Sequence, residues 1–337
     1  MLKKRQIIPS LLGMALFCYL LVPTLLLGQQ WEEDPIPDAN ADSLTNPVEF
    51  KTGTVVANGL QFSFLELGEG PLILALHGFP DHARSFRHQM PALADAGYRV
   101  VAPYMRGYAP TDAPADAPYD YGVLVQDTLA LIDALGGEST ILIGHDFGAV
   151  AAYGAAALAS EKVTKLITIA SPYGGFYQSL MLNPEEQRRK WYMFYFQSFP
   201  GAETAVALDD FAFIERLWKD WSPGWRIPKE EMAAVKETLS KPGVLTAALT
   251  YYHHIFNPIP ASPEIQEIRD NYGGPIKVPT LYIYGKRDGC VGLEVSEGME
   301  DLFPLGLRKE LILGAGHFVH QQRPMLVNRL ILKFLLE

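Results

Sequence analysis

The sequence predicts an α/β protein in which a mostly parallel central sheet carries an inserted helical cap. Short apolar runs of strand length alternate with helical segments through most of the chain, a pattern typical of a parallel sheet covered by helices. A long aromatic-rich segment interrupts this alternation once. With 337 residues, 48% of them hydrophobic and 20% charged, the chain is long enough for one globular domain with an insertion.

The predicted strands differ in their exposure. The first two are expected to pair as a hairpin, and several later ones are continuous apolar runs, as in central strands buried on both faces. The predicted strands are Thr54–Ala57, Leu60–Glu66, Leu72–Leu76, Arg99–Ala102, Thr140–Ile143, Leu166–Ile169, Thr280–Tyr284 and Lys309–Leu313. The predicted helices between them are His88–Ala96, Gly122–Leu135, Ala149–Ser160 and Pro324–Leu335.

The interruption runs from about residue 174 to residue 279, and we expect it to form a helical cap over a cleft. Its sequence has helical patterns, many aromatic residues and no additional strand. Most of these aromatic side chains are expected simply to fill the interior of the cap. The sequence therefore predicts a core made of residues 50–173 and 280–337.

The N-terminus carries a predicted targeting segment. Lys3, Lys4 and Arg5 precede an uncharged run of about 22 residues, which as a helix is long enough to cross a bilayer. Residues 1–30 are therefore expected to be a signal peptide or a single membrane anchor. The folded part of the chain would then be secreted, periplasmic or held on the non-cytoplasmic side of the membrane. Residues 31–49 are acidic and contain prolines, as in an exposed linker.

Composition argues against several classes of partner. The net charge is −10 and no basic patch with interleaved aromatics occurs, so nucleic acid and acidic membrane surfaces are not expected partners. Cys290 is the one cysteine in the predicted folded body, since Cys18 lies in the apolar N-terminus, and a packed thiol is its expected role. Cysteines and histidines nowhere have metal-ligand spacing, so we expect neither a metal nor a cofactor.

The most informative motif is Gly144-His145-Asp146-Phe147-Gly148, between an apolar strand and a small-residue helix. Such a turn holds its middle residue in a strained conformation and presents its side chain to a cleft. A serine there would indicate acyl transfer, whereas Asp146 indicates displacement at a saturated carbon through a covalent alkyl ester. The alternative is that Asp146 simply caps the following helix.

Two later loops supply the partners that such a nucleophile needs. Asp288 follows the strand Thr280–Tyr284, and His317 follows the strand Lys309–Leu313, which matches the chain order nucleophile, acid, histidine. His317 would activate the water that hydrolyses the ester, and Asp288 would orient its ring. His320, expected inside the start of the last helix, is the second choice for the base.

An oxyanion site is expected before the elbow. The segment Leu76-His77-Gly78-Phe79-Pro80 follows a buried strand, so the backbone amide of Phe79 can converge with that of Phe147. These two donors would stabilise the ester oxygen during hydrolysis. His77 is expected to brace the loop.

As a set, these motifs resemble the α/β-hydrolase superfamily over residues 50–337, and within it the epoxide hydrolases that use an aspartate nucleophile. The shared pieces are His77-Gly78-Phe79-Pro80, Met105-Arg106-Gly107-Tyr108, Gly144-His145-Asp146-Phe147-Gly148, Gly285-Lys286-Arg287-Asp288 and Gly316-His317. The resemblance implies an α/β-hydrolase fold, and a small apolar epoxide and water as substrates.

The resemblance also implies two tyrosines of the cap as acids, because ring opening leaves an alkoxide that must be protonated. The family's first tyrosine motif maps onto Tyr192 and the second onto Tyr252. Their neighbours Tyr195 and Tyr251 take these places if the register differs. For any single tyrosine in this aromatic segment, packing is the alternative.

Two other functions are compatible with the motifs. Dehalogenases of the same superfamily share the aspartate, acid and histidine, but commonly place an indole N–H beside the nucleophile for the leaving halide. Phe147 offers no side-chain donor at that position, which favours the epoxide over the halide. A catalytically idle, membrane-tethered binding module is the third alternative, and it requires Asp146 and His317 to lie far apart.

Overall fold

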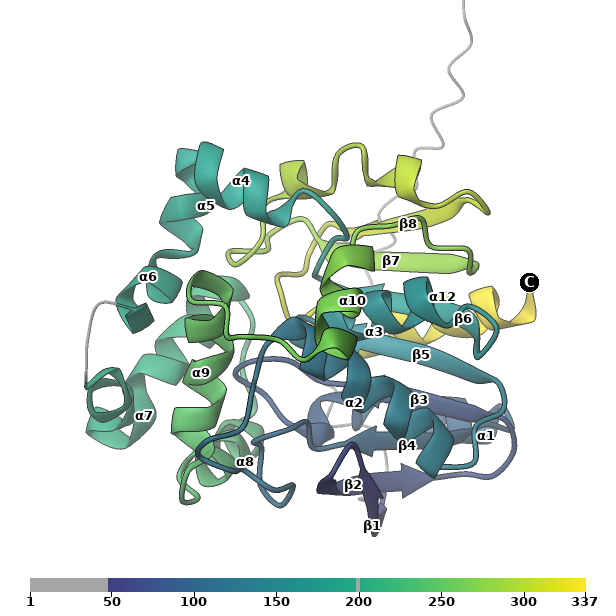
Figure 1. Ribbon diagram of the computed structural model, residues 1–337, viewed down its shortest axis with the longest axis horizontal. Coiled ribbons are helices and arrows are strands. Elements are labelled where there is room, and N and C mark those ends of the chain that lie inside the picture. Colours follow the sequence, from purple (N-terminus) through teal and green to yellow (C-terminus); the bar gives the residue numbers. More distant parts are fainter. Residues whose placement is uncertain (1–47, 198–200) are drawn as a thin grey trace, which may run out of the picture. The chain divides into compact units, whose positions relative to one another are not determined.

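Eight strands form one sheet at the centre of the computed structural model, which describes residues 48–197 and 201–337 (Figure 1). The strand order is β1-β2-β4-β3-β5-β6-β7-β8. β2 pairs antiparallel with β1 and β4, and all other neighbours are parallel, which confirms the predicted sheet. The strands are β1 (Lys51–Ala57), β2 (Leu60–Leu67), β3 (Leu72–Leu76), β4 (Arg99–Pro103), β5 (Thr140–His145), β6 (Val163–Ile169), β7 (Thr280–Gly285) and β8 (Leu307–Ile312).

The position of each strand in the sheet explains its sequence. β1 and β2 form the predicted hairpin, which turns at Asn58 and Gly59 with φ of 45° and 74°; this turn matches the twist of the strands. β1 lies at the edge of the sheet, and several of its side chains are exposed. β3 and β5 lie in the middle and are buried along their whole length, which accounts for their continuous apolar runs.

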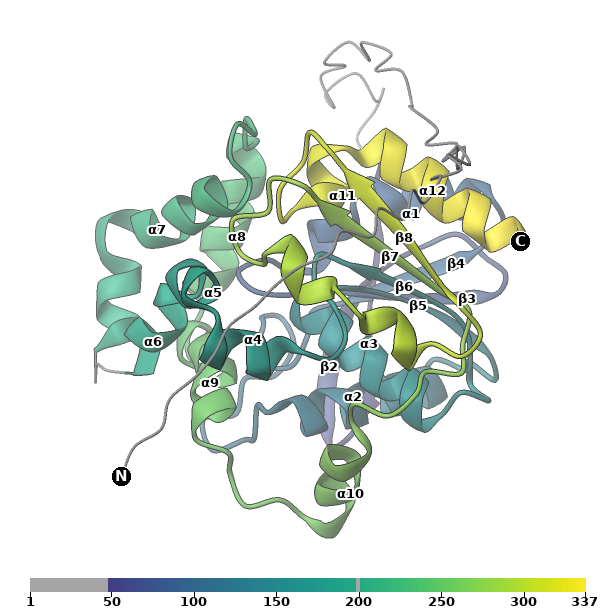
Figure 2. The same ribbon diagram turned by 90° about the horizontal axis from the view of Figure 1, so that it is seen from above.

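Helices cover both faces of the sheet (Figure 2). On one face α2 (Tyr121–Ala134) and α3 (Phe147–Leu158) pack against each other, and on the other α1 (Gln89–Asp95) lies beside α12 (Pro324–Leu336). The side chain of Asp120 accepts hydrogen bonds from the amides of Gly122 and Val123 and so caps α2. The remaining short elements are α11 (Val319–Gln322), η2 (Ala83–Phe86), η3 (Leu293–Ser296) and η4 (Met299–Leu302).

The described part of the segment between residues 174 and 279 is helical and contains no strand. Helices α5 to α9 lie together beside one end of the sheet (Figure 1). The helix α7 bends at residues 208–211, where the backbone dihedrals are not helical. The helices are α4 (Phe176–Leu182), α5 (Pro184–Arg189), α6 (Trp191–Gln197), α7 (Ala202–Trp221), α8 (Lys229–Leu239), α9 (Val244–Phe256) and α10 (Pro263–Asn271).

The last of these helices, α10, packs on the core. It contacts α2 and α3. Its Arg269 donates a hydrogen bond of 2.9 Å to Asp120, at the N-terminus of α2. The end of the inserted segment thus continues the helical layer over the sheet.

Several bounds differ from the prediction: β6 begins at Val163, three residues before the predicted Leu166, and β8 begins at Leu307, two residues before the predicted Lys309. α3 begins at Phe147, two residues before the predicted Ala149, because the turn at Asp146 leads directly into the helix. His320 lies in the separate short helix α11 and not in the last helix, since Arg323 has a non-helical backbone between α11 and α12.

The predicted targeting segment, residues 1–30, lies outside the described residues, as does the linker up to residue 47. Of the helices that the structure describes, none is both long and apolar enough to span a bilayer.

Candidate active site

Asp146 occupies a strained turn between β5 and α3. Its φ and ψ are 52° and −119°, a left-handed conformation that costs about 1–3 kcal/mol in a residue with a side chain. Two nearby glycines leave room for this turn: a Cβ at Gly148 would collide with the carbonyl of Leu76, and one at Gly78, in the loop after β3, with the side chain of Asp146. The Asp146 carboxylate makes no capping hydrogen bond to α3, so the helix-cap alternative is wrong.

His317 lies between two carboxylates. Its Nδ1 donates to Oδ2 of Asp288 at 3.0 Å, and its Nε2 lies 3.6 Å from Oδ2 of Asp146. The other Asp288 oxygen accepts from the amides of Cys290 and Val291, at 2.7 and 2.9 Å. These amides orient Asp288, which in turn fixes the His317 ring. The order predicted from the sequence therefore brings the three side chains together.

The two carboxylates set the charge of this group. Burial alone would lower the pKa of His317, but the negative charge of Asp288, the hydrogen bond to Asp288 and the contact with Asp146 raise that pKa well above its usual value. Burial opposes ionisation of Asp146, yet His317 and the Phe79 amide hold the pKa of its carboxyl below the usual value. Both shifts favour an ionised Asp146 carboxylate beside a protonated His317 ring in the free protein.

The loop after β3 supplies one of the two predicted oxyanion donors. The amide of Phe79 donates to Oδ1 of Asp146 at 2.9 Å. Phe147 is the first residue of α3, and among the described residues its amide makes no hydrogen bond to the Asp146 carboxylate. His77 braces the loop, because its Nε2 accepts from the Met105 amide at 3.0 Å, and burial lowers its pKa to about 4.

Tyr192 and Tyr252 face each other across the site from α6 and α9. Their ring centroids are 5.5 Å apart and both residues are 2% exposed. The hydroxyl of Tyr192 lies 3.5 Å from Sγ of Cys290, whereas that of Tyr252 has no hydrogen-bond partner among the described residues. Burial raises the pKa of both hydroxyls well above the usual value, and the nearby charge of Asp146 adds to this effect, so both remain protonated donors.

The neighbouring tyrosines are engaged elsewhere. Tyr251 points away from the site and donates a hydrogen bond of 2.7 Å to the carbonyl of Arg106. The Tyr195 ring stacks on Phe213 with a centroid separation of 5.6 Å, and Tyr195 is only half-buried. Neither takes the place of the first two in this geometry.

A family model for the α/β-hydrolase fold matches residues 71–324, which is most of the chain. The chain belongs to the α/β-hydrolase family. It is 32% identical over 289 residues to epoxide hydrolase 3 of Xenopus tropicalis, covering 83% of this chain and 76% of that protein. It is 31% identical to epoxide hydrolase A of Mycobacterium tuberculosis, covering 83% of this chain and 96% of the relative.

Solved structures of epoxide hydrolases are similar to this hydrolase as well. An epoxide hydrolase from Vigna radiata superposes with a TM-score of 0.73 at 27% identity, covering 85% of this chain and 98% of that one. One from Bacillus megaterium in complex with an inhibitor gives a TM-score of 0.72 at 26% identity, over 85% and 100% of the two chains. The chain is therefore an epoxide hydrolase-like α/β hydrolase.

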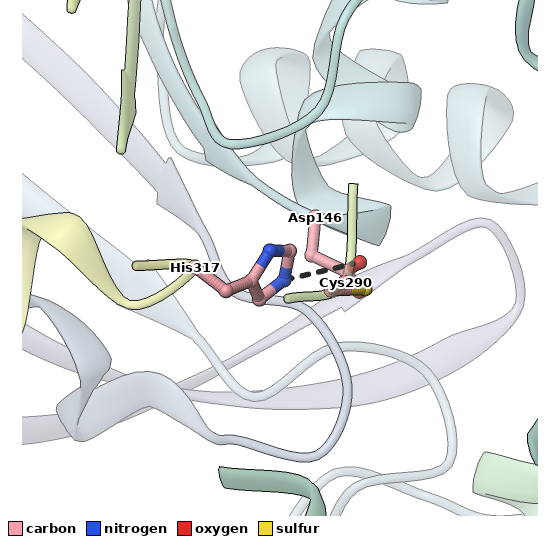
Figure 3. A group of neighbouring side chains, drawn as sticks. All are labelled: Asp146, Cys290 and His317. Carbon is pink, nitrogen blue, oxygen red and sulfur yellow. Dashed lines mark ion pairs between the residues drawn. The ribbon is translucent and has the colours of Figure 1, made fainter. Parts of the chain in front are cut away.

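The sequence analysis missed Cys290 as a residue of this hydrolase's site. Its thiol is buried beside Tyr192, and its Sγ, Nε2 of His317 and a carboxylate oxygen of Asp146 all lie within 4.8 Å of one another (Figure 3). The three follow different strands, so no spacing in the sequence reveals the cluster. The one feature of the sequence that could have placed Cys290 in the site is its position two residues after Asp288.

Trp221, the last residue of α7, is a second residue that the sequence did not indicate. Its carbonyl accepts the amides of His317 and Gly289 at 2.9 and 3.1 Å, and its indole lies 5.2 Å from the His317 ring. A helix of the inserted segment therefore holds the loops that carry the histidine and the acid. One tryptophan among many aromatics in that segment gives no signal of this role.

A buried ion pair also joins the inserted segment to the acid loop. Glu186 and Lys190 are each 2% exposed, and their charged groups lie 3.1 Å apart. Lys190 donates to the carbonyl of Cys290, and Glu186 accepts from the amide of Gly292 at 2.8 Å. Since Lys190 directly precedes α6, this contact ties the helix of Tyr192 to the loop after β7.

His320, the second candidate for the base, lies behind the site. Its Nε2 forms a hydrogen bond of 2.8 Å with the Ser85 hydroxyl, and its ring stands 4.6 Å from that of His145. His317 is the histidine that faces Asp146.

Proposed function

We propose that this hydrolase converts epoxides to vicinal diols through a covalent alkyl ester on Asp146. One observation carries the proposal: a strained carboxylate flanked by His317 lies in a buried site with two tyrosine hydroxyls, one of which, in Tyr252, has no partner among the described residues. The similarity to epoxide hydrolases supports the same reaction.

In the first step, Oδ2 of Asp146 attacks a ring carbon of the epoxide. A carbon–oxygen bond to the carboxylate forms as the ring carbon–oxygen bond breaks. Tyr192 and Tyr252 donate hydrogen bonds to the leaving oxygen, and one of them transfers its proton to that oxygen. Phe79 holds Oδ1, which leaves Oδ2 as the attacking atom.

In the second step, His317 removes a proton from water, which attacks the ester carbonyl carbon of Asp146. Loss of the carboxylate charge on alkylation lowers the pKa of His317. Its proton passes to the tyrosinate left by the first step, which restores the tyrosine and frees Nε2 to act as a base. The developing negative charge on Oδ1 is stabilised by the amides of Phe79 and Phe147. Collapse of this intermediate returns Asp146 and releases the diol, and Asp288 stabilises the imidazolium.

The test is a single turnover of styrene oxide by excess enzyme in isotopically labelled water. The ester mechanism places the label in the Asp146 carboxylate and leaves the diol unlabelled after one turnover. The variant Asp146→Asn is the companion and should be inactive. Label that appears in the diol at the wild-type rate, and not in Asp146, overturns the mechanism.

The rival dehalogenase activity is tested in the same preparation. Halide release from haloalkanes or haloacetates without any epoxide turnover would replace our proposal. The idle binding module is disfavoured, because Nε2 of His317 lies 3.6 Å from Asp146 and not out of reach.

We further propose that residues 174–279 act as the cap that supplies the acids, on a core of residues 50–173 and 280–337. The apolar rings of Phe79 and Phe147 each lie 5.0 Å from that of Tyr252, which suits a small apolar substrate.

Residues 1–30 are proposed to export the chain. N-terminal sequencing and membrane fractionation of the native protein test this, and recovery of the intact N-terminus in the cytoplasm contradicts it.

A further inference from the structure

Asp146, Cys290 and His317 bring three different metal-ligating atoms to one point. Figure 3 shows the side chains converging from the turns after β5, β7 and β8. A carboxylate oxygen, a thiol sulfur and an imidazole nitrogen within 4.8 Å of one another form a ligand set that suits Zn²⁺. Within the described residues this is the one such group.

Unpartnered polar atoms point to a ligand at this place. Nε2 of His317 is fully buried and has no hydrogen-bond partner among the described residues, and it faces Asp146. The hydroxyl of Tyr252 is buried and likewise without a partner there. Buried polar atoms rarely lack a hydrogen-bond partner. A bound ligand that accepts a hydrogen bond from these atoms, or a cation that they coordinate, would satisfy them.

The surroundings already orient the three ligands. Nδ1 of His317 donates to Asp288, the carboxylate–histidine arrangement that accompanies metal-bound histidines and leaves Nε2 as the nitrogen that can exchange its proton for a cation. The Phe79 amide holds one oxygen of Asp146 and leaves the other to bind. Lys190 donates to the carbonyl of Cys290, which fixes the backbone that carries the thiol.

We propose that Asp146, Cys290 and His317 form an inhibitory site for a thiophilic divalent cation, for which Zn²⁺ is the prototype. Binding displaces two protons to solvent, one from the Cys290 thiol and one from Nε2 of the His317 ring, and the thiolate and carboxylate together balance the two positive charges. Zinc bonds of about 2.0–2.3 Å require the ligands to draw closer together than in the free protein. The fourth position faces the tyrosine hydroxyls and admits water.

The bound cation blocks both the proposed nucleophile, Asp146, and the proposed base, His317. Inhibition therefore follows from cation binding if Asp146 and His317 act as proposed above, whereas the binding itself depends only on the geometry. Removal of the cation by a chelator restores both groups, so the inhibition is reversible.

The experiment titrates the metal-free full chain with ZnCl₂ and CdCl₂ and follows binding without reference to turnover. We expect one equivalent to bind, a rise in the Tm, and with Cd²⁺ the ultraviolet charge-transfer absorption of a thiolate complex. Styrene oxide hydrolysis should fall in step with occupancy and recover with EDTA. If the protein turns over no epoxide, calorimetry and absorption still decide whether the site exists.

Variants separate this site from other thiols and histidines. Cys290→Ala and Cys290→Ser should abolish the cadmium absorption and weaken Zn²⁺ binding by more than about tenfold, while Cys18→Ala should behave like the wild type. Asp288→Asn, which removes the partner of His317, should weaken binding by about 10- to 100-fold. Failure of wild-type protein to bind, or unchanged affinity in both Cys290 variants, overturns the proposal. Thermal unfolding of each metal-free variant confirms that it is folded.

Discussion

Nε2 of His317 lies 3.6 Å from Oδ2 of Asp146, while Nδ1 of the same ring is fixed by Asp288 at 3.0 Å. The first distance is too long for a good hydrogen bond, and the second is not. The hydrogen bond to Asp288 therefore fixes the ring through Nδ1, while Nε2 stays free to turn to a water in the proposed hydrolysis of the ester. The difference between the two distances suits different roles for the carboxylates: Asp288 orients the ring, and Asp146 remains available to react with a substrate.

The first prediction concerns Asp288→Asn. The amide no longer stabilises the imidazolium and favours the wrong tautomer, so ester hydrolysis should slow by about 10³–10⁴-fold, while alkylation of Asp146 is less affected. Mass spectrometry of enzyme quenched during turnover should reveal accumulated alkyl-enzyme. A variant that slows alkylation and hydrolysis equally would show that Asp288 does not act through His317 in the second step.

The second prediction concerns the tyrosine acids. Tyr192→Phe and Tyr252→Phe should each slow alkylation of Asp146 by about 10²–10⁴-fold, because each removes a donor to the leaving oxygen. Tyr251→Phe is the matched control: it loses the bond to Arg106, which costs about 1 kcal/mol of stability, and keeps the rate. Pre-steady-state quenching measures the rates. Equal loss of rate in all three variants argues for a packing role.

The third prediction concerns acid stability. Burial lowers the pKa of His82, His88 and His145 to about 3 and that of His77 to about 4. Between pH 6.5 and these values the unfolded chain binds more protons than the folded protein. The free energy of unfolding therefore falls as pH falls, by about 1.4 kcal/mol per pH unit for each such histidine.

His317 acts in the opposite direction. Its raised pKa gives a stabilisation that is present below about pH 6.5 and is lost as pH rises through the folded-state value. Burial raises the pKa of Asp81 to about 7, which acts in the same direction as His317. These two raised values do not offset the four lowered ones, so denaturant unfolding should show a net loss of stability from pH 6.5 towards pH 4. His82→Gln should reduce the slope. Stability that is flat or rises towards acid contradicts the prediction.

The fourth prediction concerns the ion pair between Glu186 and Lys190. Glu186→Gln leaves the buried Lys190 charge without its anion and should cost about 3–5 kcal/mol of unfolding free energy. The neighbouring Glu185→Gln removes an exposed pair with Arg188 and should cost less than about 1 kcal/mol. Urea unfolding compares the two. Similar small losses in both variants would show that the buried pair contributes little.

The sequence was sufficient for the parts of the fold that depend on local physical chemistry. A strand buried on both faces, such as β3 or β5, must be continuously apolar, and a turn that approaches β3 as closely as Gly148 does cannot carry a side chain. The chain order of Asp146, Asp288 and His317 follows from the parallel sheet, because loops after parallel strands meet at one edge.

The tertiary structure alone decided the neighbours of these residues. That Cys290 lies against Tyr192, that α10 packs on the core, and that Trp221 and Lys190 hold the catalytic loops depend on the paths of long connections. Such contacts join positions far apart in the chain, where neither periodicity nor motif spacing carries information. The sequence by itself determined the turn that presents Asp146 and the chain order of Asp288 and His317, and packing between distant segments decided which thiol, tyrosines and carbonyls surround them.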